Sequence, residues 1–317
     1  MPNNAYLKRQ NGLGGSDIGA LLGMSPYKTP VELWAEKVGH PASHQREGLH
    51  LRFGQHLEPF IAAEFESQTG FVTQEYLDAL VHPEHSFMYA HVDRFVVHEA
   101  WQPAVVEGAV VADALLECKT ASVYNKDEWG PSGTDQVPRA YLLQCIWYMA
   151  VTGCSKAHIA TLIGNTDFRV YQINRDEKLE QLVIDQAKRF WFDHVLEGMP
   201  PTPRSTSDVK LLHPCEVANQ RLEATPQIFE AVQQLKQLQE ESKVLEEKSE
   251  TLKTQIMHAM GSAQELSSCG KLLATWKSSK PVMRLDANSL KKQFPEAAAQ
   301  CMVTGPSQRR FVVKDFQ

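Results

Sequence analysis

The chain has 317 residues, of which 43% are hydrophobic, and carries a formal net charge of −6. This length allows two domains, and the composition is sufficient to bury a core. No stretch of about eighteen apolar residues occurs and residues 1–12 are polar, so we expect neither a membrane span nor a signal peptide. The six cysteines form no Cys-x-x-Cys pair, which argues against a zinc site or a disulfide framework and favours a reducing cytoplasm.

The charge is divided unevenly along the chain. Residues 1–204 contain 17 Lys and Arg against 25 Asp and Glu, whereas residues 205–317 contain 15 against 13. DNA-binding proteins usually carry a basic surface, but an acidic domain can bind DNA where divalent metal neutralises a carboxylate cluster. The charge alone slightly favours an ordinary acidic protein.

Three helices are predicted before residue 70. The first covers 17–22 and is capped by Ser16, and the second covers 30–38 and begins at a proline. The third covers about 55–68, and Pro59 must fall in its first turn because proline inside a helix removes a hydrogen bond. Its apolar side chains recur at helical spacing: Leu57, Phe60, Ile61 and Phe65.

Strands dominate the next part of the chain. The predicted elements are, in order, a strand over 87–97, a hairpin of 104–106 with 109–118, a helix over 138–152, a hairpin of 158–163 with 168–173, and a helix over 176–196. This order is typical of an α/β layer architecture, in which a mixed sheet is flanked by helices.

A cluster of prolines at 200, 201 and 203, followed by Ser205-Thr206-Ser207, predicts a domain boundary at residue 204 and a linker over 205–225. A heptad pattern then predicts one long helix over 226–260. Its a positions are Ile228, Leu235, Ser242, Ser249 and Ile256, and its d positions are Ala231, Leu238, Leu245, Leu252 and Ala259. The pattern favours a coiled coil, within or between chains, over a long helix packed on the body.

Residues 261–317 are predicted to form a small basic α+β tail, with strands over 272–277 and 311–316 and a helix over 287–294. Basic side chains alternate there with aromatic ones: Trp276, Arg309, Arg310, Phe311 and Lys314. Such a mixture can bind nucleic acid. A small capping module with solvated charges fits the tail equally well.

The triplet Glu117-Cys118-Lys119 ends a strongly apolar strand. Alternate side chains of a strand share one face, so Glu117 and Lys119 point the same way. Two charges beside a core are costly unless they are paired or bind metal. The triplet therefore indicates a metal site, although a simple buried ion pair is also compatible.

Two further carboxylates are expected near this triplet. Asp93 lies inside the apolar stretch 87–97, and pairing of that stretch with 109–118 brings it close to Glu117. Glu58 shares the inward stripe of its helix with Ile61, Ala62 and Phe65. Three carboxylates and a lysine suit Mg²⁺ or Mn²⁺, which prefer oxygen ligands and neutralise the charge that develops in phosphodiester hydrolysis.

This set resembles the PD-(D/E)xK nuclease superfamily, and more narrowly its YqaJ-type viral recombinase branch, the lambda-exonuclease-like family. The matching segments follow the family's order over roughly residues 9–195. They are Gly14-Gly15-Ser16-Asp17-Ile18-Gly19-Ala20-Leu21-Leu22-Gly23, Phe53-Gly54-Gln55-His56-Leu57-Glu58, Ala90-His91-Val92-Asp93, Leu116-Glu117-Cys118-Lys119-Thr120, and Val137-Pro138 followed by Tyr141 and Gln144. Two positions depart from the family: Arg94 follows the aspartate where many relatives have glycine, and Val92 precedes it in place of proline.

The resemblance implies a restriction-endonuclease-like fold with two Mg²⁺ ions, for which Mn²⁺ can substitute. It makes Asp93, Glu117 and the backbone carbonyl of Cys118 metal ligands. It also makes Glu58 a ligand or support of the second ion, and Lys119 the residue that holds the attacking water.

The resemblance also assigns contacts with DNA. Arg9 and Ser16 match the spacing of the 5′-phosphate pocket of the lambda enzyme. Gln144 matches the motif glutamine of the family near the scissile bond, and Tyr141 shares its helix face. The extension after residue 204 has no counterpart in that enzyme.

The implied activity is a Mg²⁺-dependent 5′→3′ exonuclease on linear double-stranded DNA, which leaves a 3′ single strand for a phage annealing protein. A ring trimer in the cytoplasm of a bacterial host, of phage or prophage origin, is implied in the same way. Two alternatives remain: a structure- or nick-directed endonuclease of the same fold, and a non-catalytic DNA-binding or scaffold module whose coiled coil recruits a recombination protein.

Overall fold

The computed structural model describes residues 11–40, 48–283, 285–303 and 309–314. The chain divides into two compact units, with the division between His213 and Pro214. This division lies beyond the boundary predicted at residue 204, because a short helix after the proline-rich segment packs on the first unit.

The first unit begins with two short helices, α2 (Gly15–Leu21) and α3 (Pro30–Lys37). α3 has the predicted proline start. α2 differs from the prediction, because its N-cap is Gly14 and Ser16 lies inside the helix with an exposed side chain. The Asp17 carboxylate accepts a hydrogen bond from the Gly14 N–H at 3.0 Å and fills the capping role expected of Ser16.

The helix α4 (Leu49–Thr69) begins before the predicted start at residue 55, so Pro59 lies inside it rather than in its first turn. Pro59 is exposed, and the burial of Ile61 and Phe65 on the opposite side keeps the helix continuous despite the missing N–H. Phe60, which was predicted to face inward, is exposed. The buried stripe is therefore narrower than the sequence predicts.

Five strands form a mixed sheet in the order β1–β4–β7–β8–β9. Their bounds are β1 (Val72–Gln74), β4 (Arg94–Val97), β7 (Ala114–Ala121), β8 (Lys156–Ile163) and β9 (Asp167–Asn174). Neighbouring strands are antiparallel except β7 and β8, which are parallel and are connected through the 3₁₀ helix η1 (Val123–Glu128) and the helix α5 (Arg139–Thr152). The predicted α/β class and the β8–β9 hairpin are confirmed.

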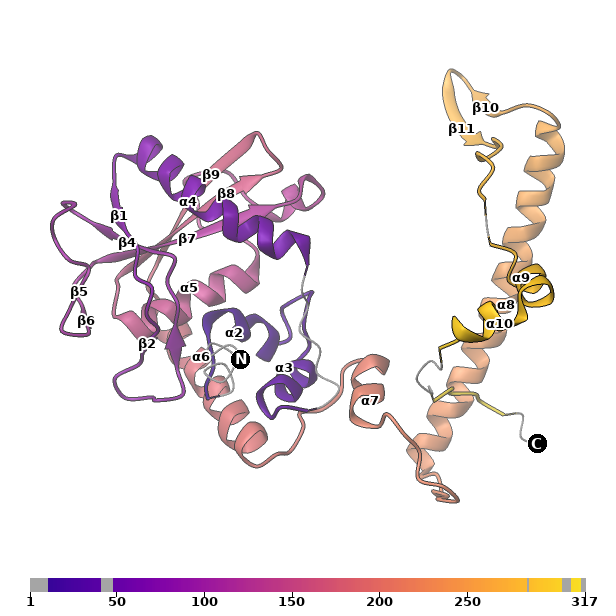
Figure 1. Ribbon diagram of the computed structural model, residues 1–317, viewed down its shortest axis with the longest axis horizontal. Helices are drawn as coiled ribbons and strands as arrows, with labels where there is room; N and C mark the ends of the chain where they lie inside the picture. Colours follow the sequence, from indigo (N-terminus) through magenta and orange to yellow (C-terminus); the bar gives the residue numbers. More distant parts are fainter. Residues whose placement is uncertain (1–10, 41–47, 284, 304–308, 315–317) are drawn as a thin grey trace. The chain divides into compact units, whose positions relative to one another are not determined.

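Helices cover both faces of this sheet (Figure 1). Ile61 and Phe65 of α4 pack on one face. On the other face α5 lies with α2 and α6 (Glu177–Arg189) around the fully buried Trp147. α6 continues as a π-helix, η2 (Phe190–Leu196), within the range predicted for one helix.

The sequence predicts continuous strands over 87–97 and 109–118, but each is interrupted before it enters the main sheet. Their first halves form two small hairpins: β2 (Leu80–Val81) with β3 (Tyr89–Ala90), and β5 (Val105–Val106) with β6 (Ala109–Val110). The β5–β6 turn is the predicted Glu107-Gly108 pair, in which both residues have positive φ angles. Apolar composition does not reveal where a chain leaves one sheet for another.

The segment predicted as a linker contains a helix, α7 (Thr206–Leu212), which Ser205 caps. Asp208 anchors α7 to the first unit. Its fully buried carboxylate accepts hydrogen bonds from the Thr29 hydroxyl at 2.6 Å and from the Arg204 N–H at 2.8 Å. The proline-rich segment is therefore followed by a packed element rather than by a free connection.

The second unit contains the long helix α8 (Pro226–Met260), which spans the range of the heptad pattern and is capped by Thr225. It is followed by a hairpin of β10 (Glu265–Ser268) with β11 (Lys271–Thr275) and by the helices α9 (Ala287–Gln293) and α10 (Pro295–Gln300). Residues 311–314, the described part of the predicted last strand, have no regular structure. Among the described residues, no helix is long and apolar enough to cross a membrane.

Candidate active site

The pairing of β4 with β7 brings Asp93 to Glu117. Arg94 lies opposite Leu116 in this antiparallel pair, so the residue before Arg94 lies beside the residue after Leu116. The Asp93 carboxylate accepts a hydrogen bond from the Cys118 N–H at 2.8 Å. The juxtaposition predicted from the apolar pattern is thus present in the fold.

Glu117 and Lys119 share one face of β7 and form an ion pair. Glu117 is 2% exposed, and its Oε1 atom also accepts a hydrogen bond from Nε2 of Gln144 at 2.6 Å. The Lys119 ammonium lies 5.1 Å from the centre of the Tyr141 ring, a distance that allows a cation–π contact. The predicted lysine and glutamine therefore converge on one carboxylate.

The second carboxylate oxygen of Glu117, Oε2, is buried and has no hydrogen-bond partner among the described residues. Burial and the neighbouring Asp93 raise the pKa of Glu117 to about 8, against the opposing effect of Lys119. Burial likewise raises the pKa of Asp93. Buried polar atoms are nearly always satisfied, so an unpartnered oxygen in such a cluster fits a cation-binding position.

Glu58 reaches the cluster from α4 but is held by another side chain. Its carboxylate accepts a hydrogen bond from the Arg94 guanidinium at 2.9 Å, and the same guanidinium contacts the Asp93 carbonyl at 2.5 Å and Glu75 at 3.4 Å. Burial and Asp93 raise the pKa of Glu58, whereas Arg94 lowers it. Arg94 therefore links the Glu58 carboxylate to the backbone of Asp93.

These contacts leave no complete set of metal-binding side chains within the described part of the chain. Within residues 11–40, 48–283, 285–303 and 309–314, no group of three or more His, Cys, Asp or Glu side chains is placed to hold a metal ion. Glu58 is engaged by Arg94, and Glu117 by Lys119 and Gln144. Asp93 and the free oxygen of Glu117 still fit a hard cation, because such ions commonly use one or two carboxylates and complete their shell with water and phosphate.

Tyr148 also belongs to this site, although no sequence motif singles it out. Its hydroxyl contacts Nε2 of Gln144 at 3.1 Å, so the glutamine lies between Tyr148 and Glu117. The spacing of four residues on one helix was the available signal. A Cβ atom at Gly15 would lie 2.4 Å from the Tyr148 ring, which explains why the close contact of α2 with α5 needs a glycine.

Comparison with known proteins gives the family. Residues 6–155 match the YqaJ-like viral recombinase domain, and the chain is 34% identical over 298 residues to the protein YqaJ of Bacillus subtilis, covering 92% of this chain and 87% of that protein. The chain belongs to the YqaJ-like viral recombinase family. The resemblance inferred from the motifs is confirmed.

Solved structures similar to this YqaJ-like protein include two exonucleases. An alkaline exonuclease from Laribacter hongkongensis has a TM-score of 0.47 at 16% identity, covering 61% of this chain and 92% of that one. A phage-related exonuclease from Haemophilus somnus has a TM-score of 0.40 at 13% identity, covering 59% and 96%.

The residues predicted to bind DNA in this YqaJ-like protein lie in different environments. Arg9 is outside the described residues. Ser16 is exposed on α2, directly after the glycine that touches Tyr148. Tyr141 stacks on Trp129, with ring centres 5.5 Å apart, and the Lys119 ammonium lies near the Tyr141 ring. The roles of these residues and of the Cys118 carbonyl stay predictions.

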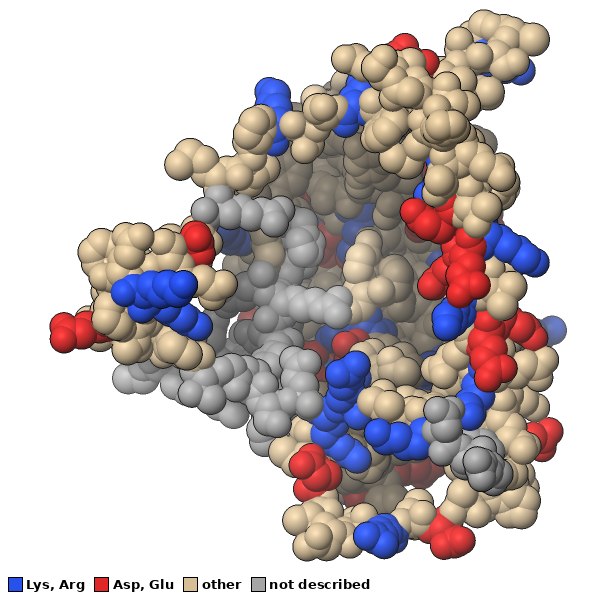
Figure 2. Space-filling view, turned by 90° about the vertical axis from the view of Figure 1, so that its right-hand side faces the viewer, with Lys and Arg blue, Asp and Glu red and all other residues tan. Residues whose placement is uncertain are grey.

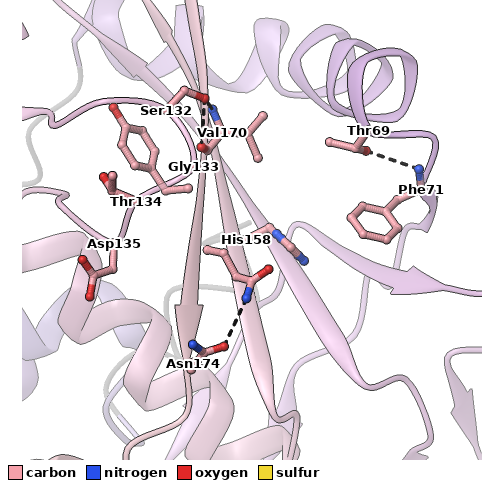
Figure 3. A pocket seen from close by; sticks show the side chains of 11 residues that line it. Thr69, Phe71, Ser132, Gly133, Thr134, Asp135, His158, Val170 and Asn174 are labelled. Carbon is pink, nitrogen blue, oxygen red and sulfur yellow. Dashed lines mark hydrogen bonds between the residues drawn. The ribbon is translucent and has the colours of Figure 1, made fainter.

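A cavity of about 450 Å³ lies elsewhere in the YqaJ-like fold, between the end of α4, the loop 132–135 and the strands β8 and β9 (Figure 3). His158 lines it, and its ring packs against Phe65 and Phe71 with centres 5.5 and 5.4 Å apart. Burial and then Lys156 lower the pKa of this imidazole. None of the carboxylates discussed above lines the cavity, so it is separate from the candidate active site.

Proposed function

We propose that the protein is a divalent-metal-dependent deoxyribonuclease that digests linear duplex DNA from its 5′ end and leaves a 3′ single strand. The observation that carries this proposal is the buried Glu117 carboxylate beside Asp93 and the Lys119 ammonium, with one oxygen that no described residue contacts by a hydrogen bond. Membership of a viral recombinase family supports an enzyme that prepares DNA for recombination. A single-strand annealing protein is then the expected recipient of the product.

Asp93 and Glu117 would hold Mg²⁺ or Mn²⁺, together with the Cys118 carbonyl. Such an ion, when bound, neutralises phosphate charge and lowers the pKa of a water molecule. Glu58 would be a candidate further ligand, although the Arg94 guanidinium already contacts its Oε1 atom. A second ion would therefore share the Glu58 carboxylate with Arg94.

Lys119 acts in this proposal as a cation. Burial lowers the pKa of Lys119, but Glu117 and Asp93 together raise it by more than burial lowers it. The net shift of the pKa is therefore upward, and the ammonium form dominates near neutral pH. An ammonium group donates hydrogen bonds to water or phosphate and stabilises developing negative charge, whereas it does not accept a proton. Lys119 thus positions and stabilises rather than serving as the general base.

Gln144 and Tyr148 orient Glu117 from α5. The Gln144 amide donates to one carboxylate oxygen, and the other oxygen has no hydrogen-bond partner within the described part of the chain. DNA would approach along the side where Tyr141 and Lys119 lie, and Arg9 with Ser16 would capture the 5′-phosphate, as the family resemblance implies.

The proposal is tested with linear duplex DNA that carries a 5′-phosphate at one end only, in Mg²⁺ or in EDTA, beside a closed-circular control. We expect Mg²⁺-dependent loss from the phosphorylated end while circles stay intact. Cut circles would instead indicate an endonuclease, and intact DNA throughout would indicate a binding module.

Two substitutions connect the activity to the site. Glu117→Ala should abolish cleavage, and Lys119→Ala should reduce the rate by on the order of 10²-fold, the typical cost of losing one charge-stabilising donor. Lys178→Ala, at an exposed position of α6, is the matched control. Full activity in either site variant, with the fold verified by circular dichroism, would show that the site is misplaced.

A further inference from the structure

Most apolar side chains of the heptad pattern in the helix α8 are exposed to solvent. The helix has 35 residues and is therefore roughly 50 Å long, at about 1.5 Å per residue. Every residue from 237 to 259 is exposed, and Leu245 in the middle of the stripe is 65% exposed. The d-position leucines on either side, Leu238 and Leu252, are also exposed. A helix of this length with an uncovered heptad stripe is typical of a coiled-coil strand without its partner.

We infer that the partner is α8 of a second copy of this chain, in an antiparallel coiled coil. The two-fold axis of this dimer passes between Lys243 and Val244. This inference is independent of the proposed nuclease activity, because the residues that carry it lie in the second unit.

The core layers favour the antiparallel direction. In an antiparallel pair each a position faces a d position, so with this axis both serines face leucines: Ser242 meets Leu245 and Ser249 meets Leu238. The ends of the seam pair isoleucine with alanine in the same way. Large side chains thus face small ones along most of the seam, which is the combination that fills a core evenly.

A parallel pair lacks this balance. Each a position then faces the same a position of the other copy, so Ser242 and Ser249 meet their own copies in two polar layers. The two alanine positions likewise face each other and leave underfilled layers. The apolar residues available are the same in both directions, but only the antiparallel one distributes them over every layer.

The flanking charges select the same direction. Glu241 and Lys248 occupy g positions and are exposed. In the antiparallel pair g faces g, so Glu241 of each copy meets Lys248 of the other, and two opposite-charge contacts form. In the parallel pair g faces e, so Glu241 meets Glu246 and Lys248 meets Lys253, and both contacts repel.

The self-complementary pattern identifies the second copy as the occupant. A two-fold dimer requires that a patch contact itself, so each attractive pair must occur twice with the roles exchanged. The Glu241–Lys248 pair and the serine–leucine layers satisfy this requirement. An unrelated partner helix gives no reason for such symmetry within one chain.

The first experiment measures the mass of the full chain by light scattering coupled to size exclusion. Leu245→Asp places a charge in the middle of the seam and should halve the mass of the assembly, whatever the oligomeric state of the first unit. Val244→Asp is the matched control, because Val244 is exposed but lies outside the seam. An unchanged mass for Leu245→Asp would overturn the proposal.

The second experiment determines the direction by sedimentation of charge variants. Lys248→Glu or Glu241→Lys alone should weaken the antiparallel dimer, with at least a several-fold rise in its dissociation constant, and the double exchange should restore it. The parallel arrangement predicts that each single change strengthens the dimer, because it turns a repulsive contact into an attractive one. Strengthening by both, or no rescue in the double variant, would overturn the antiparallel inference. Lys243→Glu, outside the seam, controls for the change in net charge.

Discussion

At the residue scale, Glu117 combines complete burial with an incomplete set of partners. Burial favours the protonated form of an isolated carboxyl group, and burial together with Asp93 raises the pKa of Glu117 despite the opposing effect of Lys119. Folding without metal therefore stabilises the protonated form of Glu117. A bound cation would reverse this preference, so metal binding and proton release at Glu117 are linked.

We expect the free energy of unfolding of the metal-free protein to fall between about pH 5 and pH 8. The pKa of Glu117 is raised from 4.5 to about 8, so across this interval the native protein retains a proton that the unfolded chain has released, and rising pH favours the unfolded chain. Glu117→Gln should reduce this decline, and the exposed Glu177→Gln should not. Urea unfolding in EDTA at several pH values measures it, and a decline of wild-type size in Glu117→Gln would assign it to another group.

Gly15 is expected to be sensitive to a single methyl group. Gly15→Ala forces the Tyr148 ring and α2 apart and should lower the free energy of unfolding by about 1–3 kcal/mol, the typical cost of overpacking. Gly54→Ala, inside α4 with its nearest neighbour atom 3.7 Å from the added carbon, should instead be neutral or raise stability by up to about 1 kcal/mol. Urea denaturation of both variants decides whether the α2–α5 contact limits the size of residue 15.

The candidate site was predictable where it depends on the geometry of one strand or on the pairing of two neighbouring strands. Glu117 and Lys119 share a face because strands alternate, and Asp93 follows from the pairing of two apolar stretches. The hydrogen bond from Arg94 to Glu58 was not predictable, because it joins a strand to a helix 36 positions earlier. The spacing of residues within one element does not indicate which side chains of two distant elements come into contact. Tyr148 was missed for a similar reason, since an aromatic residue on a buried face is compatible with both core and site.

At the scale of elements, local signals located the ends of helices better than the breaks in strands. Gly70 and Gly153 have positive φ angles and end α4 and α5 within about one residue of the predicted ends at 68 and 152. Pro59 misled the prediction because tertiary burial of one helix face outweighs the loss of a single hydrogen bond. The strand 87–97 was predicted as continuous because both of its halves are buried, although they belong to different sheets.

α7 offers a test of where the first unit ends. Asp208→Asn leaves the side chain the same size but removes one of the two acceptors that bind Thr29 and the Arg204 N–H. We expect a loss of about 1–3 kcal/mol in the free energy of unfolding, the usual cost of leaving a buried polar group unsatisfied. The exposed Asp127→Asn should change nothing measurable. Equal stability of the two variants would mean that α7 is attached only loosely.

At the scale of the whole molecule, the distribution of charge bears on how DNA is bound. Acidic and basic side chains are interspersed on the face that Figure 2 shows, and neither kind covers it continuously. The excess of acidic residues lies in the first 204 positions, which include the carboxylates of the candidate site. Binding of DNA by the first unit is therefore expected to depend on divalent metal more than on a general basic surface.

The division of the chain predicts that catalysis and self-association are separable. A fragment of residues 1–213 contains Glu58, Asp93, Glu117 and Lys119 together with α7, but it lacks α8. It should fold, retain Mg²⁺-dependent cleavage of linear duplex DNA, and have half the number of subunits of the full chain. A fragment ending at residue 204 should be less stable, because it loses Asp208 and its contacts with Thr29.

Cleavage rates and light-scattering masses of the full chain and the two fragments provide the comparison. Because the first unit forms its sheet, its cores and the ion pairs of the site without α8, loss of α8 is expected to change assembly and not the rate per active site. A fragment 1–213 that is folded but inactive would show that the second unit contributes to binding DNA or to the site itself. A fragment 1–213 with as many subunits as the full chain would place self-association in the first unit and contradict the pairing of α8.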